Sequence, residues 1–213
     1  MLSPTMTASR PSTGQQLSIF DAPSPSGSED RTHHALDEAS WVDHIHAWLP
    51  EPEALFAELA ALAGWEQRSR WMFTRTVIEP RLTAEFPSLA DATIVEVRRI
   101  GEQLSQRYGV PYDSAWLNLY RDHNDSTGWH ADRPASLCPT AVVPVLSLGA
   151  TRRFLLRPSQ GGRSKVLVVK AGDLVVMGGR CQRDWVHAVP KETVRAGARI
   201  SVNFGSSSQA CDG

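Results

Sequence analysis

The carboxyl-terminal half of the chain alternates short apolar runs with glycine and proline turns. The runs after Pro111 have the length of strands, roughly four to eight residues, and they are rich in Val, Leu, Ile and Phe. They read AWLNLYR, AVVPVLSLG, RRFLLRP, SKVLVVKAGDLVVMGG, DWVHAVP and ARISVNFG. Many short strands with this punctuation predict a β-sandwich, a jelly roll or a barrel.

The segment before these runs has apolar residues at helical spacing. The stretch ASWVDHIHAWLPEPEALFAELAAL predicts two short helices divided at Pro50 and Pro52, because proline disrupts a helix interior. We interpret its two histidines, His44 and His46, as surface or capping residues. The stretch LADATIVEVRRIGEQLSQRYG predicts a longer helix that ends at Gly109. The predicted fold class is mainly β with amino-terminal helices, an α+β chain with an antiparallel double-sheet core.

The first residues of the chain differ in composition from the rest. Residues 1–38 are rich in Ser, Pro, Thr and Gly and carry few large apolar side chains. Such a segment cannot bury enough apolar surface to fold, so we expect a disordered tail there. Residues 39–213 have the length of one domain, with a helical region over 39–110 and the strand core over 111–207.

The formal net charge of -1 is unevenly distributed along the chain. Residues 1–38 carry two Arg against five acidic residues, which leaves 20 basic and 18 acidic residues in the remainder. A local basic patch for phosphate groups is compatible with that balance. The chain has no apolar run near the ~20 residues of a membrane span and no secretory signal, so we expect a cytoplasmic protein without membrane contact.

The stretch GWHADR places a histidine and an aspartate two residues apart. On a strand, His130 and Asp132 would point to the same face. With His187 as a third ligand, the set leaves open positions on a metal, as in non-heme Fe(II) oxygenases. In such an enzyme Arg199 could hold a carboxylate of a 2-oxoglutarate co-substrate with its guanidinium fork. Spacing alone leaves open that the histidines are core residues and that Arg199 lies at the surface.

Several segments, in the same order, resemble the AlkB family of Fe(II)- and 2-oxoglutarate-dependent dioxygenases. They are WLNLYRDHNDSTGWHAD, VPVLSLGATRRFLLRP, GDLVVMGGRCQRDWVHAVPK and ARISVNFG, and upstream MFTRTVIEPRLTA is similar to the family's substrate lid. The resemblance implies a double-stranded β-helix, a jelly-roll variant, behind a helical and lid region. It also implies oxidative removal of alkyl groups from nucleobases in DNA alkylation repair. The implied cofactors are Fe(II), 2-oxoglutarate and dioxygen, and the implied products include succinate, CO₂ and formaldehyde.

The resemblance also implies roles for single residues. The implied iron ligands are His130, Asp132 and His187. By motif, Asn118, Tyr120 and Arg199 are expected to bind 2-oxoglutarate. Ser201 and Asn203 share the strand face of Arg199 and are expected to bind it too. The chain departs from the family pattern at Gly205, where relatives carry a second arginine, and we therefore expect weaker co-substrate binding. It also departs after Asp132, where acidic residues are frequent in relatives.

A base inside a duplex is out of reach of a buried iron, so the substrate base must be flipped out or single-stranded. Aromatic faces can stack on the base and cations can hold the phosphates. The side chains expected to do so are Trp71, Phe73, Arg75, Arg81, Trp129 and Arg133. For the first two, a role in the core stays open. We expect alkylated single- or double-stranded DNA, or RNA, as the partner of a monomeric protein.

Two other classes of function fit the same motifs. One is an oxygenase of the same fold that acts on RNA, a protein or a small molecule. The other is a binding module that has lost turnover, an alternative motivated by Gly205. The fold does not distinguish them, because jelly rolls support many functions.

Overall fold

The structure is a computed structural model, and it describes residues 29–62, 64–72 and 74–209. The strands and α-helices of these residues are, in chain order, β1 (Arg31–Ala35), β2 (Ser40–Ile45), α1 (Pro52–Ala60), β3 (Ser69–Met72), β4 (Arg75–Ile78), β5 (Leu82–Phe86), α2 (Val95–Tyr108), β6 (Ser114–Tyr120), β7 (Thr127–His130), β8 (Ala141–Gly149), β9 (Arg152–Pro158), β10 (Lys165–Val169), β11 (Leu174–Gly179), α3 (Cys181–Asp184), β12 (Trp185–Val189) and β13 (Arg199–Gly205). Two short 3-10 turns are η1 (Ala135–Leu137) and η2 (Ser207–Gln209).

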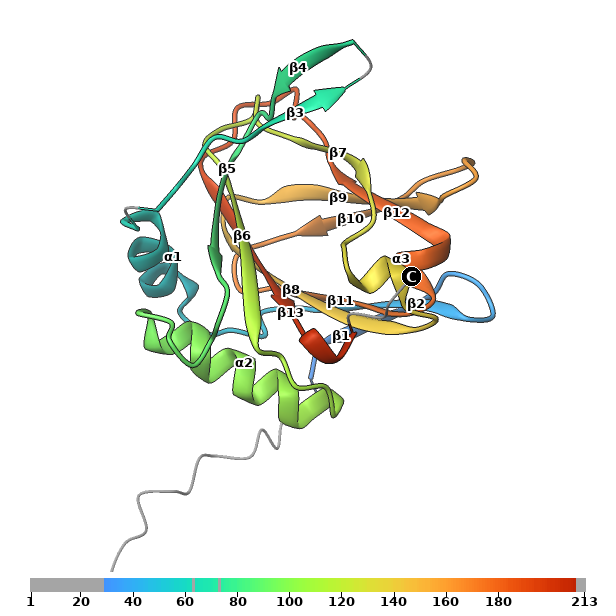
Figure 1. The fold of residues 1–213 in the computed structure, drawn as a ribbon, viewed down its shortest axis with the longest axis horizontal. Coiled ribbons are helices and arrows are strands. Elements are labelled where there is room, and N and C mark those ends of the chain that lie inside the picture. Colours follow the sequence, from blue (N-terminus) through green and yellow to red (C-terminus); the bar gives the residue numbers. More distant parts are fainter. Residues whose placement is uncertain (1–28, 63, 73, 210–213) are drawn as a thin grey trace, which may run out of the picture.

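Two antiparallel sheets form the body of the molecule (Figure 1). The larger has the strand order β1-β2-β11-β8-β13-β6-β5, and the smaller has the order β10-β9-β12-β7. An apolar cluster draws side chains from both sheets and fills the space between them: Val42, Val143, Val145, Val175 and Met177 from one, and Phe154, Leu156, Leu167 and Val169 from the other. Strands β3 and β4 pair only with each other and project from the body as a hairpin (Figure 1).

The two longer helices cover the outer face of the larger sheet (Figure 1). A second apolar cluster joins them to that face, and its members include Leu55, Leu59, Val97, Ile100, Leu104, Leu117, Leu146, Ile200 and Val202. Among the described residues, no helix has the length and apolar character needed to cross a membrane.

Most of the predicted architecture is confirmed. The apolar runs after Pro111 form β6 and β8 to β13, and their two facing sheets make the predicted jelly roll. Helix α2 ends at Gly109, whose φ of 65° is the left-handed conformation that glycine adopts readily at a helix end. Helix α1 begins at Pro52, also as predicted.

Two predictions for the amino-terminal segment are wrong. Residues 40–45, expected in a helix, form β2, and residues 31–35, expected in a disordered tail, form β1 beside it. Strand β2 buries Val42 between the sheets and Ile45 toward the helices. Periodicity alone cannot distinguish a strand buried on both faces from a helix, and here pairing with β11 fixes the strand. The rest of the predicted tail, residues 1–28, lies outside the described residues.

Strand β2 fits against β11 because one glycine leaves room for a tryptophan. Trp41 lies opposite Gly178 in the register of the two strands. A Cβ atom built on Gly178 would lie 2.0 Å from Cζ2 of Trp41. The indole ring therefore occupies the space that any other residue's side chain would need.

We expect Gly178→Ala to lower the free energy of unfolding by roughly 1–3 kcal/mol, the usual cost of overpacking. Trp41→Leu in the same chain should recover part of that loss, since it removes the ring that the new methyl group meets. Gly64→Ala is the matched control, because a Cβ there has nothing within 4 Å. Urea denaturation of the four proteins measures the effect, and equal midpoints for the Gly178 and Gly64 variants would contradict it.

Candidate metal centre

Two neighbouring strands of the smaller sheet bring two histidines together. His130 is the last residue of β7, and His187 lies directly opposite it in β12. Asp132 lies two residues beyond the end of β7, so the strand alternation assumed from the sequence does not itself position this side chain. Its carboxylate nevertheless faces the histidines, with Oδ1 at 3.6 Å from Nε2 of each ring.

These three side chains have the geometry of a metal-ligand set. Their ligand atoms all lie within 4.8 Å of one another. Nδ1 of His130 lies 2.9 Å from the carbonyl oxygen of Gly128, and a donating Nδ1–H there leaves Nε2 free to bind a metal. The His187 ring stacks on Phe154 at 5.2 Å between centroids, which fixes its plane. The structure thus brings all three predicted ligands together.

Electrostatics favours the metal-binding protonation states of Asp132 and His187, but not that of His130. Burial opposes ionisation of Asp132, but the adjacent histidines outweigh it and hold the pKa of this carboxyl well below its usual range. Burial lowers the pKa of His187, which favours the neutral imidazole. Burial also acts to lower the pKa of His130, yet the hydrogen bond and charge of Asp132 raise it overall. An ionised carboxylate and neutral imidazoles are the forms that act as ligands.

A glutamine that the sequence analysis did not single out orients the aspartate. Gln182, in α3, donates from Nε2 to Oδ2 of Asp132 at 3.2 Å and accepts the Asp132 backbone N–H at 2.8 Å. Its side chain is buried. Nothing in the motif RCQRDW indicates this role, because only the packing of α3 brings the amide to the loop after β7.

A cavity of about 930 Å³ opens beside the three candidate ligands. The predicted 2-oxoglutarate residues line it: Asn118, Tyr120, Arg199, Ser201 and Asn203. The walls come from β6 and β13 of the larger sheet and from β7, β9 and β12 of the smaller one. The candidate ligands lie on one side of this space and the buried arginine belongs to the opposite sheet.

Arg199 is a buried cation with hydrogen-bonding capacity to spare. Its Nε donates to Oγ of Ser147 at 2.9 Å, whereas its Nη1 has no hydrogen-bond partner among the described residues. The guanidinium lies 5.3 Å from the ring centroid of Tyr120, and burial lowers its pKa. A buried guanidinium is costly without a counter-charge. The carboxylate of a co-substrate in this cavity would supply one.

The other polar side chains of the cavity form a chain of hydrogen bonds. Arg81 donates from Nε to Oδ1 of Asn118 at 2.8 Å, and Asn118 donates from Nδ2 to Oγ of Ser201 at 3.2 Å. Asn203 donates from Nδ2 to the carbonyl oxygen of Trp116 at 2.8 Å. These bonds fix the amide orientations along the wall that faces the candidate metal ligands.

The predicted substrate-contacting residues are only partly brought to the cavity. Arg81 and Arg133 line it. Trp129 does not, because it precedes His130 on β7 and so faces the other way, where the guanidinium of Arg157 lies 4.2 Å from its ring centroid. Trp71 is 70% exposed on the β3–β4 hairpin. The predictions for Phe73 and for the side chain of Arg75 lie outside the described part of the chain.

A second buried arginine holds the loops around the centre. Arg152 in β9 donates to the carbonyl oxygens of Asp122 and Asp125 before β7 and of Pro190 after β12. Its neighbour Arg153 is exposed, as expected for adjacent strand residues that face opposite sides. No motif around Arg152 predicts that it joins these two loops.

A jelly roll with two histidines and one carboxylate beside a cavity is typical of the non-heme Fe(II) oxygenases. Comparison with known proteins agrees. The family model for the 2OG-Fe(II) oxygenase superfamily matches residues 24–204, so the chain belongs to this family.

Curated relatives of the chain include AlkB homologues, in agreement with the resemblance of the motifs. The chain is 32% identical to "Alpha-ketoglutarate-dependent dioxygenase alkB homolog 3" of Bos taurus over 73% of this chain and 62% of that protein. It is 28% identical to "DNA oxidative demethylase ALKBH2" of Arabidopsis thaliana over 86% and 72%. The chain thus spans a little over three fifths of the length of the alkB homolog 3 protein.

A solved structure shares the fold. The protein of "The structure of OsALKBH1" superposes with a TM-score of 0.57 and 15% sequence identity, covering 80% of this chain and 99% of that chain. At this identity the match supports the jelly-roll architecture.

We expect Gln182→Ala to weaken metal binding by roughly 10–100-fold, the usual effect of losing a group that orients a ligand. Binding of Mn(II), a redox-stable substitute for iron, can be followed by electron paramagnetic resonance. Gln103→Ala, on the exposed surface of α2, is the control. Equal affinities for the two variants would show that Asp132 is held without Gln182.

We expect Gly205→Arg to tighten 2-oxoglutarate binding by roughly ten-fold, because a charge-assisted bond exceeds a neutral one by about 1 kcal/mol or more. Gly205 lines the cavity, and a Cβ there meets only the rotatable Oγ of Ser114 within 3 Å. Arg199→Ala should weaken binding far more. Calorimetry on the Mn(II)-loaded protein measures both, and Gly205→Met controls for size without charge. Unchanged affinity in Arg199→Ala would place the co-substrate elsewhere.

Proposed function

We propose that this protein is an Fe(II)- and 2-oxoglutarate-dependent dioxygenase that removes alkyl groups from nucleobases in the repair of alkylated DNA. The observation that carries the proposal is one cavity lined both by the ligand set His130, Asp132 and His187 and by the buried guanidinium of Arg199. The printed names of the AlkB relatives, which include a DNA oxidative demethylase, support this choice of substrate.

The described side chains divide the work of such a reaction between them. When bound, iron and 2-oxoglutarate, with dioxygen as the oxidant, would supply the oxidation, in which one oxygen atom enters succinate as CO₂ is lost and the other enters the methyl group, which leaves as formaldehyde. The two histidines and Asp132 would hold the metal with open positions. Arg199 would pair with the distal carboxylate of 2-oxoglutarate, and Asn118 and Tyr120 would hydrogen-bond the same molecule.

The substrate would approach past the β3–β4 hairpin. The loop before β7 is tied to the segment after β4 by a hydrogen bond from the Ser126 N–H to the Pro80 carbonyl, so the hairpin is joined to the cavity region. The hairpin exposes Trp71 and Ile78, both of which can pack on bases. Arg81 and Arg133 line the cavity and would supply cations there. These features favour a base that is flipped out or single-stranded.

The proposal extends to the cellular compartment and the oligomeric state of the protein. Nucleic acid and 2-oxoglutarate are intracellular, so we place the protein in the cytoplasm. We propose that it acts as a monomer, since the proposed metal ligands and Arg199 need no residue from a second chain.

The proposal predicts release of formaldehyde and succinate when the Fe(II)-loaded protein meets oligonucleotides that carry 1-methyladenine or 3-methylcytosine. His187→Ala should reduce turnover to background, since it removes an iron ligand, whereas His33→Ala, on strand β1, should leave it unchanged. Single-stranded DNA, duplex DNA and RNA of one sequence are compared for substrate preference. Succinate without any base repair would indicate another substrate class, and no succinate at all would indicate a binding module.

A further inference from the structure

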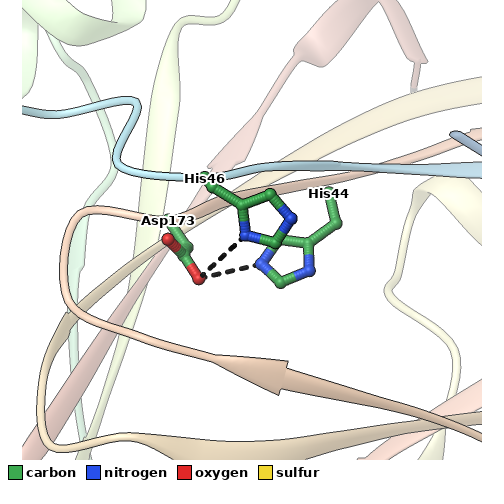
Figure 2. A group of neighbouring side chains, drawn as sticks. All are labelled: His44, His46 and Asp173. Atoms are coloured by element: carbon green, nitrogen blue, oxygen red, sulfur yellow. Dashed lines mark hydrogen bonds and ion pairs between the residues drawn. The ribbon is translucent and has the colours of Figure 1, made fainter. Parts of the chain in front are cut away.

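A second group of histidines and a carboxylate lies away from the cavity. His44 lies in β2, His46 follows the end of that strand, and Asp173 is the last residue of the turn between β10 and β11 (Figure 2). None of the three is among the cavity-lining residues. The prediction that both histidines are surface or capping residues is wrong for His44, which is buried together with Asp173.

Both rings present a nitrogen to one carboxylate oxygen (Figure 2). Oδ2 of Asp173 lies 2.8 Å from Nε2 of His44 and 3.9 Å from Nδ1 of His46. The ring centroids of the two histidines are 4.0 Å apart. The longer of the two distances is beyond hydrogen-bond range, so a hydrogen bond to Asp173 does not explain the orientation of the His46 ring.

Two backbone N–H groups bind the carboxylate in addition to Nε2 of His44, which lies 2.8 Å from Oδ2. Oδ1 of Asp173 accepts the backbone N–H of Ala47 at 2.9 Å, and Oδ2 accepts that of Lys170 at 2.8 Å. These two bonds fix the carboxylate in the turn.

The candidate iron centre provides an internal standard. Among the described residues, two groups of three or more such side chains could hold a metal ion, and both contain two histidines and one aspartate. In the first, the carboxylate oxygen lies 3.6 Å from both imidazole nitrogens; in the second, the corresponding distances are 2.8 and 3.9 Å. Ligand atoms on a tetrahedral zinc, with bonds of about 2.0 Å, lie roughly 3.3 Å apart. That separation falls between the two distances of the second group.

We propose that His44, His46 and Asp173 form a second metal site, for a divalent transition metal of the zinc class, separate from the iron centre. His44 would bind through Nε2, His46 through Nδ1, and Asp173 through Oδ2, with solvent in the fourth position. The His46 side chain is 35% exposed, so the proposed site borders solvent on the side of this residue. Two imidazoles and one carboxylate are ligands that zinc accepts.

The surroundings favour the protein forms that bind zinc. Nε2 of His46 lies 3.3 Å from Oγ1 of Thr32, a hydrogen-bond partner for the ring nitrogen that does not face the metal. Burial lowers the pKa of His44, which keeps its imidazole neutral. Burial acts to raise the pKa of Asp173, but hydrogen bonds from Lys170, Ala47 and His44 lower it overall, so the carboxylate is ionised.

The site would join two parts of the fold. Strand β2 belongs to the amino-terminal segment, whereas the β10–β11 turn belongs to the jelly-roll core. A metal bound by both would link that segment to the core at the end of β2, next to the backbone hydrogen bond from Leu49 to Gly172. Zinc should therefore raise the thermal stability of the chain by mass action, in proportion to its affinity for the folded state.

The test counts zinc ions per chain. Protein stripped with a chelator is dialysed against Zn(II) at neutral pH, and bound metal is measured by atomic emission. We expect two zinc ions in the wild type, one in His46→Ala, one in His187→Ala and none in the double variant. His33→Ala, which removes another histidine near β2, should still bind two.

A second readout works without the iron centre. In the His187→Ala chain, zinc should raise the melting temperature, and the added His46→Ala change should abolish that rise. Asp173→Asn, which keeps the side-chain size, repeats the test with the third ligand. The proposal is overturned if His46→Ala binds as much zinc as the wild type, or if zinc leaves the melting temperature of the His187→Ala chain unchanged. Neither result depends on substrate turnover, so a failure here is distinct from a failure of the proposed dioxygenase function.

Discussion

The pairing of β7 with β12 is the constraint on which the candidate active site depends. It places His130 opposite His187, although 57 positions separate them in the chain. A slip of one residue in this register would turn one of the two imidazoles to the other face of the sheet. Arg152 stabilises this register, because it donates hydrogen bonds to backbone carbonyls both before β7 and after β12. Gln182 then orients the third ligand, Asp132, which no strand holds.

The opposite wall of the cavity is organised around one buried cation. Arg199 retains an unpaired Nη1 among the described residues, and its other neighbours are a serine hydroxyl and an aromatic ring. An uncompensated buried guanidinium destabilises the protein, and a carboxylate bound in the cavity would relieve that destabilisation. Gly205 leaves this cation without the second arginine expected from AlkB relatives, so the co-substrate would depend on a single guanidinium. Affinity for 2-oxoglutarate would then be concentrated in one side chain.

The sequence predicted the parts of the molecule in which local pattern and function coincide. The strands after Pro111, the helix that ends at Gly109 and the three candidate ligands are all visible as periodicity or motif. It could not predict Gln182 or Arg152, because each acts through backbone groups that only the folded chain brings near. It placed Trp129 at the substrate, whereas strand alternation turns that ring away from His130 and against an arginine.

The amino-terminal strand pair shows why local pattern fails when both faces of a segment are buried. The residues of β2 have helical spacing, and as a strand they are buried on both faces without alternation, so contacts with the core decide between helix and strand. The fit of Trp41 over Gly178 is one such contact, and the hydrogen bond from Ala47 to Asp173 is another. The proposed zinc site would be a third at the same junction. A metal there would stabilise the strand pairing that the local sequence leaves undecided, since its ligands come together only when β2 lies beside β11.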